Sequence, residues 1–313
     1  MATSSQLPIS TTKEDAADAQ DPATLRAEIA RLTTELASLR TQSQPNPPSP
    51  SALPNPTLPE SFPLYPSHPL LLLSDSALPL GTFAFSSGLE SYLAHHKSPT
   101  SRPSSANHPT KKTALDTFLP LSLASTATLC LPFLLAAHRD PTQVIRLADE
   151  MDAASVCTVA RRASVSQGRA LLSVWERALV GSAAEDVAEG VAALAALGRA
   201  SKASGGEEAD GVGPHFAPVW GAVTAVMGLS ARQSAWVFLF GQARAVVSAA
   251  VRASVLGPYQ AQAVLASTAV PERIGRLVEE CWGIGVEDAG QSAPLLDLWQ
   301  GRHELLYSRI FNS

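Results

Sequence analysis

The chain has 313 residues, and only 16% of them are charged, against about 25% in an average soluble domain. Its formal net charge of −5 leaves no excess of basic residues to neutralise phosphates, which argues against a nucleic-acid-binding protein. The cysteines Cys130, Cys157 and Cys281 are odd in number and form no CxxC pair, which excludes a disulfide scaffold or a cysteine zinc site and favours a reducing compartment.

Residues 1–63 are predicted to be a disordered arm that contains one short amphipathic helix at about residues 22–40. Asp21 is suited to the N-cap position of such a helix, and Pro22 is suited to its first helical position. Apolar residues then recur in steps of four and three: Leu25, Ile29, Leu32, Leu36 and Leu39. This pattern covers about two heptads, so we expect a marginal lone helix, with weak pairing to a partner helix as the alternative. Eight prolines within residues 41–63 predict a polyproline-biased linker.

Residues 64–313 are predicted to form a single all-α domain, a helical bundle. Apolar residues at helical spacing run through residues 144–158, 165–179, 187–197, 236–255 and 264–281. We find no alternating strand pattern and no hairpin turn between such patterns. Polar segments near residues 97–112 and 201–213 are predicted to be flexible insertions between helices.

The segment Thr117–Ala137 is uncharged and long enough to span a membrane. Pro120, Pro132 and several hydroxyl side chains interrupt it, and no Lys/Arg cluster flanks it. We therefore expect a buried helix and no membrane, and a helical membrane protein is the alternative. The amino terminus shows no secretory signal pattern, so we expect a cytoplasmic protein.

No sequence pattern of an active site is present: there is no P-loop, GxGxxG, HExxH, GxSxG or EF-hand motif. His95 and His96, with His108, could contact a soft divalent metal. A solvated helix end is the simpler interpretation, so we predict no metal site. Cys130 and Cys157 are expected to be buried, inert thiols within helices, and His215 is expected to help begin a helix. The residues alone therefore predict a helical binding module with no visible active site.

Three segments resemble the urease accessory protein F (UreF) family. LLLSDSALPLGTFAFSSGLESYL at residues 71–93 is similar to the opening family pattern DSALPxGxFxxSxGLE. The central segments ARRASVSQGRALL and HFAPVWGAVTAVMGLSARQSAWVFLFGQARAVVSAAVRASVLGPYQAQ resemble the family's middle helices. DLWQGRHELLYSRIFNS at residues 297–313 is similar to a closing RHExLYSRLF element. The signature positions of the opening pattern are Asp75, Pro79, Gly81, Phe83, Ser86, Gly88 and Glu90.

The resemblance implies an all-helical homodimer that has no reaction of its own and holds no cofactor stably. Such a protein joins the nickel-carrying GTPase UreG to accessory protein UreH, also called UreD, while Ni²⁺ passes through the complex into apo-urease. An alternative role is a GTPase-activating regulator of UreG that inserts an arginine such as Arg302 or Arg309. The long amino-terminal arm and the two insertions depart from a minimal family member and suggest a eukaryotic chain of fungal type.

The resemblance also indicates candidate partner-binding residues. The closing element is expected to be a separate last element that docks UreH through Arg302, His303, Glu304, Tyr307 and Arg309, with packing back onto its own bundle as the alternative. Arg244 and Arg252 repeat on one helical face, which either lines an interface or faces solvent. Gln167 and Gly168 are expected to interrupt a helix, where they either bind a partner or allow close packing.

Overall fold

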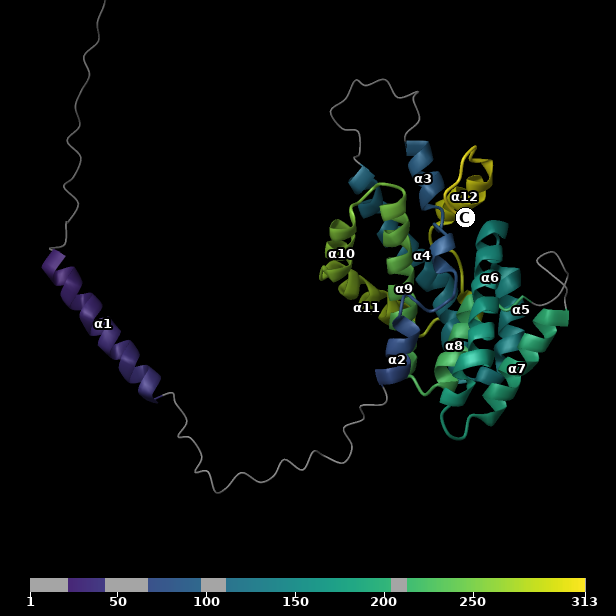
Figure 1. Cartoon of the computed structure of the whole chain (residues 1–313), viewed down its shortest axis with the longest axis horizontal. Coiled ribbons are helices and arrows are strands. Elements are labelled where there is room, and N and C mark those ends of the chain that lie inside the picture. Colours follow the sequence, from purple (N-terminus) through teal and green to yellow (C-terminus); the bar gives the residue numbers. More distant parts are fainter. Residues whose placement is uncertain (1–21, 43–66, 97–110, 204–212, 313) are drawn as a thin grey trace, which may run out of the picture. The chain divides into compact units, whose positions relative to one another are not determined.

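The computed structural model describes residues 22–42, 67–96, 111–203 and 213–312, in which all regular structure is helical (Figure 1). The predicted all-α class is therefore confirmed. The predictions of a disordered terminus, a proline-rich linker and two flexible insertions fall wholly or mostly outside the described residues, as does His108. The chain divides into two units, residues 1–62 and residues 63–313.

The described residues of the first unit form one helix, α1 (Pro22–Gln42). Its apolar residues Ile29, Leu32 and Leu36 are 61%, 51% and 58% exposed. The described part of this unit therefore has no core of its own.

The second unit is built around α4 (Lys111–Arg139), which packs against α8 (Phe216–Val226), α9 (Ala231–Arg252) and α11 (Ala269–Cys281). Pro120 and Pro132 both lie inside α4, which nevertheless continues as one helix. Among the described helices, α4 and α9 are long and apolar enough to cross a membrane, but more than half of each apolar window is buried inside the unit. Both therefore have the burial of core helices, in agreement with the buried helix expected at residues 117–137.

The predicted apolar face at residues 144–158 belongs to two helices, α5 (Val144–Ala154) and α6 (Thr158–Val174). Cys157 occupies the residue before α6, so it is not inside a helix as expected. The predicted interruption at Gln167 and Gly168 is also wrong, because α6 runs through both. A Cβ on Gly168 would lie 1.6 Å from the carbonyl oxygen of Pro214, so this glycine permits close packing instead of breaking the helix.

Two further helix ends differ from the prediction. Helix α9 ends at Arg252, before the end of the apolar pattern at residues 236–255, and Ser254 takes a left-handed φ of 56° in the turn that follows. Gly257 then caps α10 (Pro258–Ala266), so the single stretch expected at residues 264–281 is divided between α10 and α11. The remaining helices are α2 (Ser67–Ser74), η1 (Thr82–Ala84), α3 (Leu89–His96), η2 (Pro141–Gln143), η3 (Trp175–Leu179), η4 (Val180–Ser182), α7 (Ala188–Ala203), η5 (Val286–Asp288), α12 (Pro294–Arg302) and η6 (His303–Leu305).

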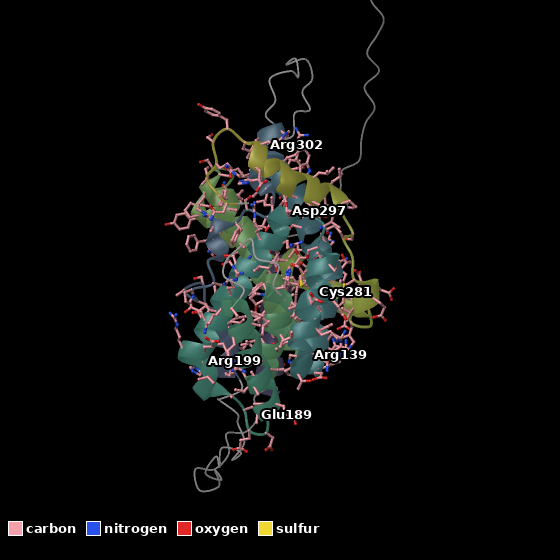
Figure 2. The ribbon with its side chains drawn as sticks, turned by 90° about the vertical axis from the view of Figure 1, so that its right-hand side faces the viewer. Arg139, Glu189, Arg199, Cys281, Asp297 and Arg302 are labelled. Carbon is pink, nitrogen blue, oxygen red and sulfur yellow. The ribbon has the colours of Figure 1, made fainter. Side chains whose placement is uncertain are left out.

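Helix α12 packs against α3 and α6, which lie far from it in the sequence. Figure 2 shows Asp297 and Arg302 of this helix toward one end of the second unit, with Glu189 of α7 toward the other. The opening and closing sequence patterns thus meet in one region.

Candidate functional site

The loop that carries the opening pattern is shaped by its polar and glycine residues. The backbone N–H of Ala77 donates to Oδ1 of Asp75 at 2.9 Å, and Gly81 and Gly88 take φ values of 69° and 87°. A Cβ on Gly88 would lie 3.1 Å from Cγ of Gln300 and 3.3 Å from Cβ of Trp299. The loop therefore lies directly against α12. Ser86 is buried at the end of this loop, whereas Pro79 and Phe83 are exposed.

Glu90 in the first turn of α3 holds the carboxyl-terminal segment. Its Oε2 accepts from Nε2 of His303 at 2.8 Å and from the backbone N–H of Phe311 at 3.2 Å. Its Oε1 accepts from the backbone N–H of Ile310 at 2.8 Å. His303 is fully buried and Phe311 is 4% exposed. We call Glu90, His303, Ile310 and Phe311 the tail clasp.

The tail clasp shows that the closing element packs back onto its own bundle, which was the alternative to a separate last element. His303 is buried against Glu90, so it is not placed to dock a partner. Glu304 pairs with Arg162 of α6, and Nε of Arg302 donates to Nε2 of His95 at 3.0 Å. The other ring nitrogen of His95 lies 2.8 Å from the carbonyl oxygen of Ser91, so neither nitrogen is open to a metal. Only the backbone of His96 is described, in the last turn of α3.

Four side chains between His303 and Phe311 face outward. Leu305, Tyr307 and Ile310 are 77%, 106% and 62% exposed, and Arg309 is exposed beside them in sequence. We call these four residues the tail surface. An apolar and aromatic group with a neighbouring cation is the composition that anchors protein interfaces.

Two arginines of α9, Arg244 and Arg252, contact neighbouring segments of the same chain. Arg244 donates to the carbonyl oxygen of Ser74 at the end of α2. The guanidinium carbon of Arg252 lies 4.2 Å from the centre of the Phe311 ring, a cation–π contact. Burial lowers the pKa of both arginines. Each therefore supports an adjacent segment of its own chain, a role that their spacing in the sequence did not indicate.

A cavity of about 370 Å³ lies beneath the loop, with a wall drawn from α4, α6, α9 and α12. On one side Nε2 of Gln242 donates to Oγ of Ser87 at 3.2 Å and to Oγ of Ser122 at 3.1 Å. Gln167 also lines the cavity, and its Nε2 donates to the carbonyl oxygen of Ala163, so it is held within its own helix.

Three sulfur-containing residues line the same cavity: Cys130, Met151 and Cys157. Burial raises the pKa of the Cys130 thiol to about 12, so this thiol stays protonated and is a poor nucleophile at neutral pH. Within the described ranges, no three His, Cys, Asp or Glu residues are grouped so as to hold a metal ion.

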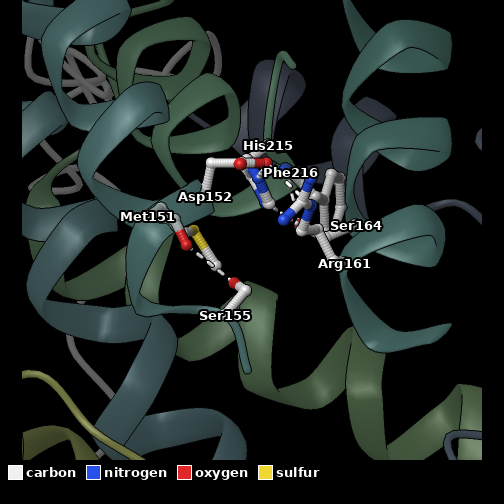
Figure 3. A network of polar contacts seen from close by, with 7 residues as sticks. All are labelled: Met151, Asp152, Ser155, Arg161, Ser164, His215 and Phe216. Atoms are coloured by element: carbon white, nitrogen blue, oxygen red, sulfur yellow. Dashed lines mark hydrogen bonds and ion pairs between the residues drawn. The ribbon is translucent and has the colours of Figure 1, made fainter. Parts of the chain in front are cut away.

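A polar network at the edge of the cavity joins α5, α6 and α8 (Figure 3). Nε2 of the fully buried His215 lies 3.0 Å from Oδ1 of Asp152, which also pairs with Nε of Arg161 at 3.1 Å. Nδ1 of His215 lies 3.0 Å from Oγ of Ser164, which accepts from the backbone N–H of Phe216 at 3.2 Å.

This network contains the Ser, His and Asp residue types of a catalytic triad, but its hydrogen bonds hold the start of α8 in place. Ser164 satisfies the first backbone N–H of α8, and His215 ties that serine to Asp152. His215 was expected to help begin a helix, and it is the residue that immediately precedes α8, although its side chain does not bond to the backbone of that helix. Ser164 and Asp152 carry no local sequence signal for this task, because both lie on other helices more than 50 residues away.

The comparisons with known proteins agree with the family that the sequence patterns indicated. The family model described as UreF matches residues 110–269. The chain is similar to an uncharacterized urease accessory protein UreF-like of Schizosaccharomyces pombe, at 37% identity over 248 residues, which cover 79% of this chain and 97% of that protein. It is similar to urease accessory protein F of Oryza sativa subsp. indica at 32% identity, over 76% of this chain and 82% of the relative. Identity to urease accessory protein UreF of Paenarthrobacter aurescens is 30%, over 77% and 95% of the two chains.

Proposed function

This chain belongs to the urease accessory protein UreF family, which serves urease maturation, and from that premise we propose that it is a non-enzymatic scaffold. In this role it bridges the nickel-carrying GTPase UreG and UreD/UreH during nickel insertion into apo-urease. It acts in the cytoplasm as a homodimer, and it binds neither nucleic acid nor membrane.

The tail clasp is the observation that carries this proposal. Glu90 fixes both ends of a short segment, between which Leu305 and Tyr307 point away from the bundle. Holding the segment in advance reduces the conformational entropy that the segment itself loses when a partner binds it. We therefore assign UreD/UreH docking to the tail surface. Four of the candidate partner-binding residues are excluded from this docking role because each makes contacts inside its own chain: His303, Gly168, Arg244 and Arg252.

Nickel is the cargo of this scaffold and not a resident cofactor. Burial raises the pKa of the Cys130 thiol in the cavity wall to about 12, and a thiol must lose its proton to bind a metal firmly, so we assign Cys130 no role as a firm nickel ligand. The carboxylate of Asp297 and several hydroxyl and amide oxygens line the same cavity and offer weak, exchangeable contacts.

Binding of purified UreD/UreH to a Tyr307→Ala variant tests the docking assignment. We expect affinity to fall roughly 30-fold, since an interface anchor contributes about 2 kcal/mol. Tyr259→Ala on α10 is a matched control, because Tyr259 is also almost fully exposed, at 91%. The melting temperatures of both variants should equal that of the wild type. Equal affinity of the Tyr307→Ala and Tyr259→Ala variants would contradict the assignment.

The second candidate function is activation of UreG by an inserted arginine. Arg309 fits it better than Arg302, because Arg309 lies on the exposed tail surface whereas Arg302 donates to His95. The two functions separate in a GTP-turnover assay with the Arg309→Ala variant. An activator loses turnover while the complex stays intact, whereas a scaffold keeps the turnover of each complex that still forms.

A further inference from the structure

The contacts that support the scaffold function proposed above lie in the second unit, whereas helix α1 belongs to the first. It is one continuous helix of 21 residues, so its sequence positions translate directly into faces. The exposed residues Ile29, Leu32 and Leu36 follow one another in steps of three and four and therefore lie on one side. Most of the stability of a helix in a protein comes from packing of its apolar face, which raises the question of what covers that side.

We propose that α1 pairs with α1 of a second copy of this chain in a parallel, two-stranded coiled coil. The heptad places Ile29 and Leu36 at the a positions. It places Leu25, Leu32 and Leu39 at the d positions. Ile29 is β-branched, and a β-branched residue at a with leucine at d favours two strands in a parallel arrangement, while Leu36 keeps the other a position apolar.

The charges beside the seam select the same arrangement. Glu28 and Glu35 occupy g positions, whereas Arg26 and Arg40 occupy e positions. In a parallel pair, a g position faces the following e position of the other copy, which sets Glu35 against Arg40 of the partner subunit. In an antiparallel pair, g positions face each other, so the two glutamates would meet like charges. The sequence of this helix therefore complements a second copy of itself in one orientation.

Disulfide trapping in the full-length chain tests the proposal. Leu25→Cys and Leu39→Cys place one thiol near each end of the seam, and Thr34→Cys places one on the opposite, f-position face. The unchanged chain measures any linkage through its own three cysteines. We expect both seam variants to form linked dimers on mild oxidation, in yields on the order of tenfold above Thr34→Cys, because pairing raises the local thiol concentration.

The same trap distinguishes the other arrangements. An antiparallel pair crosses near its midpoint, so Leu32→Cys would link whereas neither end variant would, and this outcome would overturn the proposal. Seam variants that link no better than Thr34→Cys would overturn it as well, leaving a lone helix or a partner other than this chain.

Charge reversal tests the facing of Glu35 and Arg40. Adding Glu35→Lys to the Leu39→Cys variant should lower the yield of linked dimer, because lysine then meets arginine. Adding Arg40→Glu as well should restore it. A yield of linked dimer that is the same in all three variants would contradict the parallel register. Binding of UreD/UreH to the tail surface should be unchanged in all these variants, so the scaffold function is tested separately.

Discussion

At the scale of single residues, Glu90 holds the carboxyl-terminal segment against α3. One carboxylate with 11% of its side chain exposed accepts from an imidazole and from two backbone N–H groups. Hydrogen bonds to a charged group are each worth about 1.5–3 kcal/mol, and a buried group that loses its partner costs a similar amount. The glutamate of the opening pattern is thus explained by the closing pattern that it holds.

Glu90→Gln should lower the free energy of unfolding by about 2 kcal/mol or more, because an amide has one acceptor oxygen and no charge. Glu304→Gln is the matched control, since the Glu304–Arg162 pair is exposed and should contribute less than about 1 kcal/mol. Urea unfolding of both variants measures the difference. Equal losses in the two variants would show that the clasp contributes no more than a surface ion pair.

His215 makes stability depend on pH. Burial lowers its pKa, although the bond and the charge of Asp152 act in the opposite direction and Arg161 acts with burial. The folded state therefore prefers the neutral ring. The contribution to stability is complete above the ordinary histidine pKa of about 6.5, and it is lost as pH falls through the lowered pKa of the folded state. His138 has a pKa lowered by burial too and adds a loss of the same sign.

We expect the wild-type chain to be less stable at pH 5 than at pH 7.5 and His215→Asn to show a smaller difference between the two. His138→Gln serves as the comparison that removes the second contribution. Unfolding free energies at the two pH values measure the effect. The assignment fails if His215→Asn loses as much stability on acidification as the wild type does.

At the scale of elements, close approach between helices depends on glycine. Gly168 of α6 faces the carbonyl oxygen of Pro214, and Gly221 of α8 faces that of Leu134, where a Cβ would lie only 2.1 Å away. Backbone atoms of a neighbouring segment cannot move aside as a flexible side chain can. These two contacts therefore set how closely α4, α6 and α8 pack.

Gly168→Ala should destabilise the chain by about 2–3 kcal/mol or more, because the added methyl group forces α6 away from residues 214 and 215. Gly241→Ala is the matched control: Gly241 lies within α9 and a Cβ there meets nothing within 4 Å. Alanine has the higher helix propensity, so this control should be neutral or more stable by up to about 1 kcal/mol. Thermal melts of both variants would reveal a wrong assignment if Gly168→Ala melted with the control.

At the scale of the whole molecule, the chain consists of two units with different sources of stability. The second unit has a large core in which Trp175, Phe118 and Phe133 are at most 1% exposed. Helix α1 has an exposed apolar side instead and depends on what pairs with it. Stability of the bundle and association through the arm should therefore be separable.

Removing residues 1–62 should leave the melting temperature of the second unit and its binding to UreD/UreH unchanged. The helical signal should fall only by the share of α1, and association through α1 should disappear. Calorimetry and binding of the truncated chain check these outcomes. A lower melting temperature would indicate that the arm stabilises the bundle.

Local patterns were enough to predict the helical class and the family. Apolar residues at helical spacing mark buried faces whatever their partners are, and the opening and closing patterns are contiguous stretches. The same information placed helix ends poorly, because the boundary between α5 and α6 and the end of α9 depend on backbone turns that interrupt continuous apolar patterns.

Only the tertiary structure decided what the signature residues do. Glu90 and His303 are 213 positions apart, and His215 and Asp152 are 63 apart, so no local pattern could pair them. The same folding buried His303 while leaving Tyr307 exposed, although both belong to one short sequence element. The sequence determined which segments are helical and which family they resemble, since those properties are local. The fold determined which polar groups meet, because hydrogen bonding and burial depend on segments that are distant in the chain.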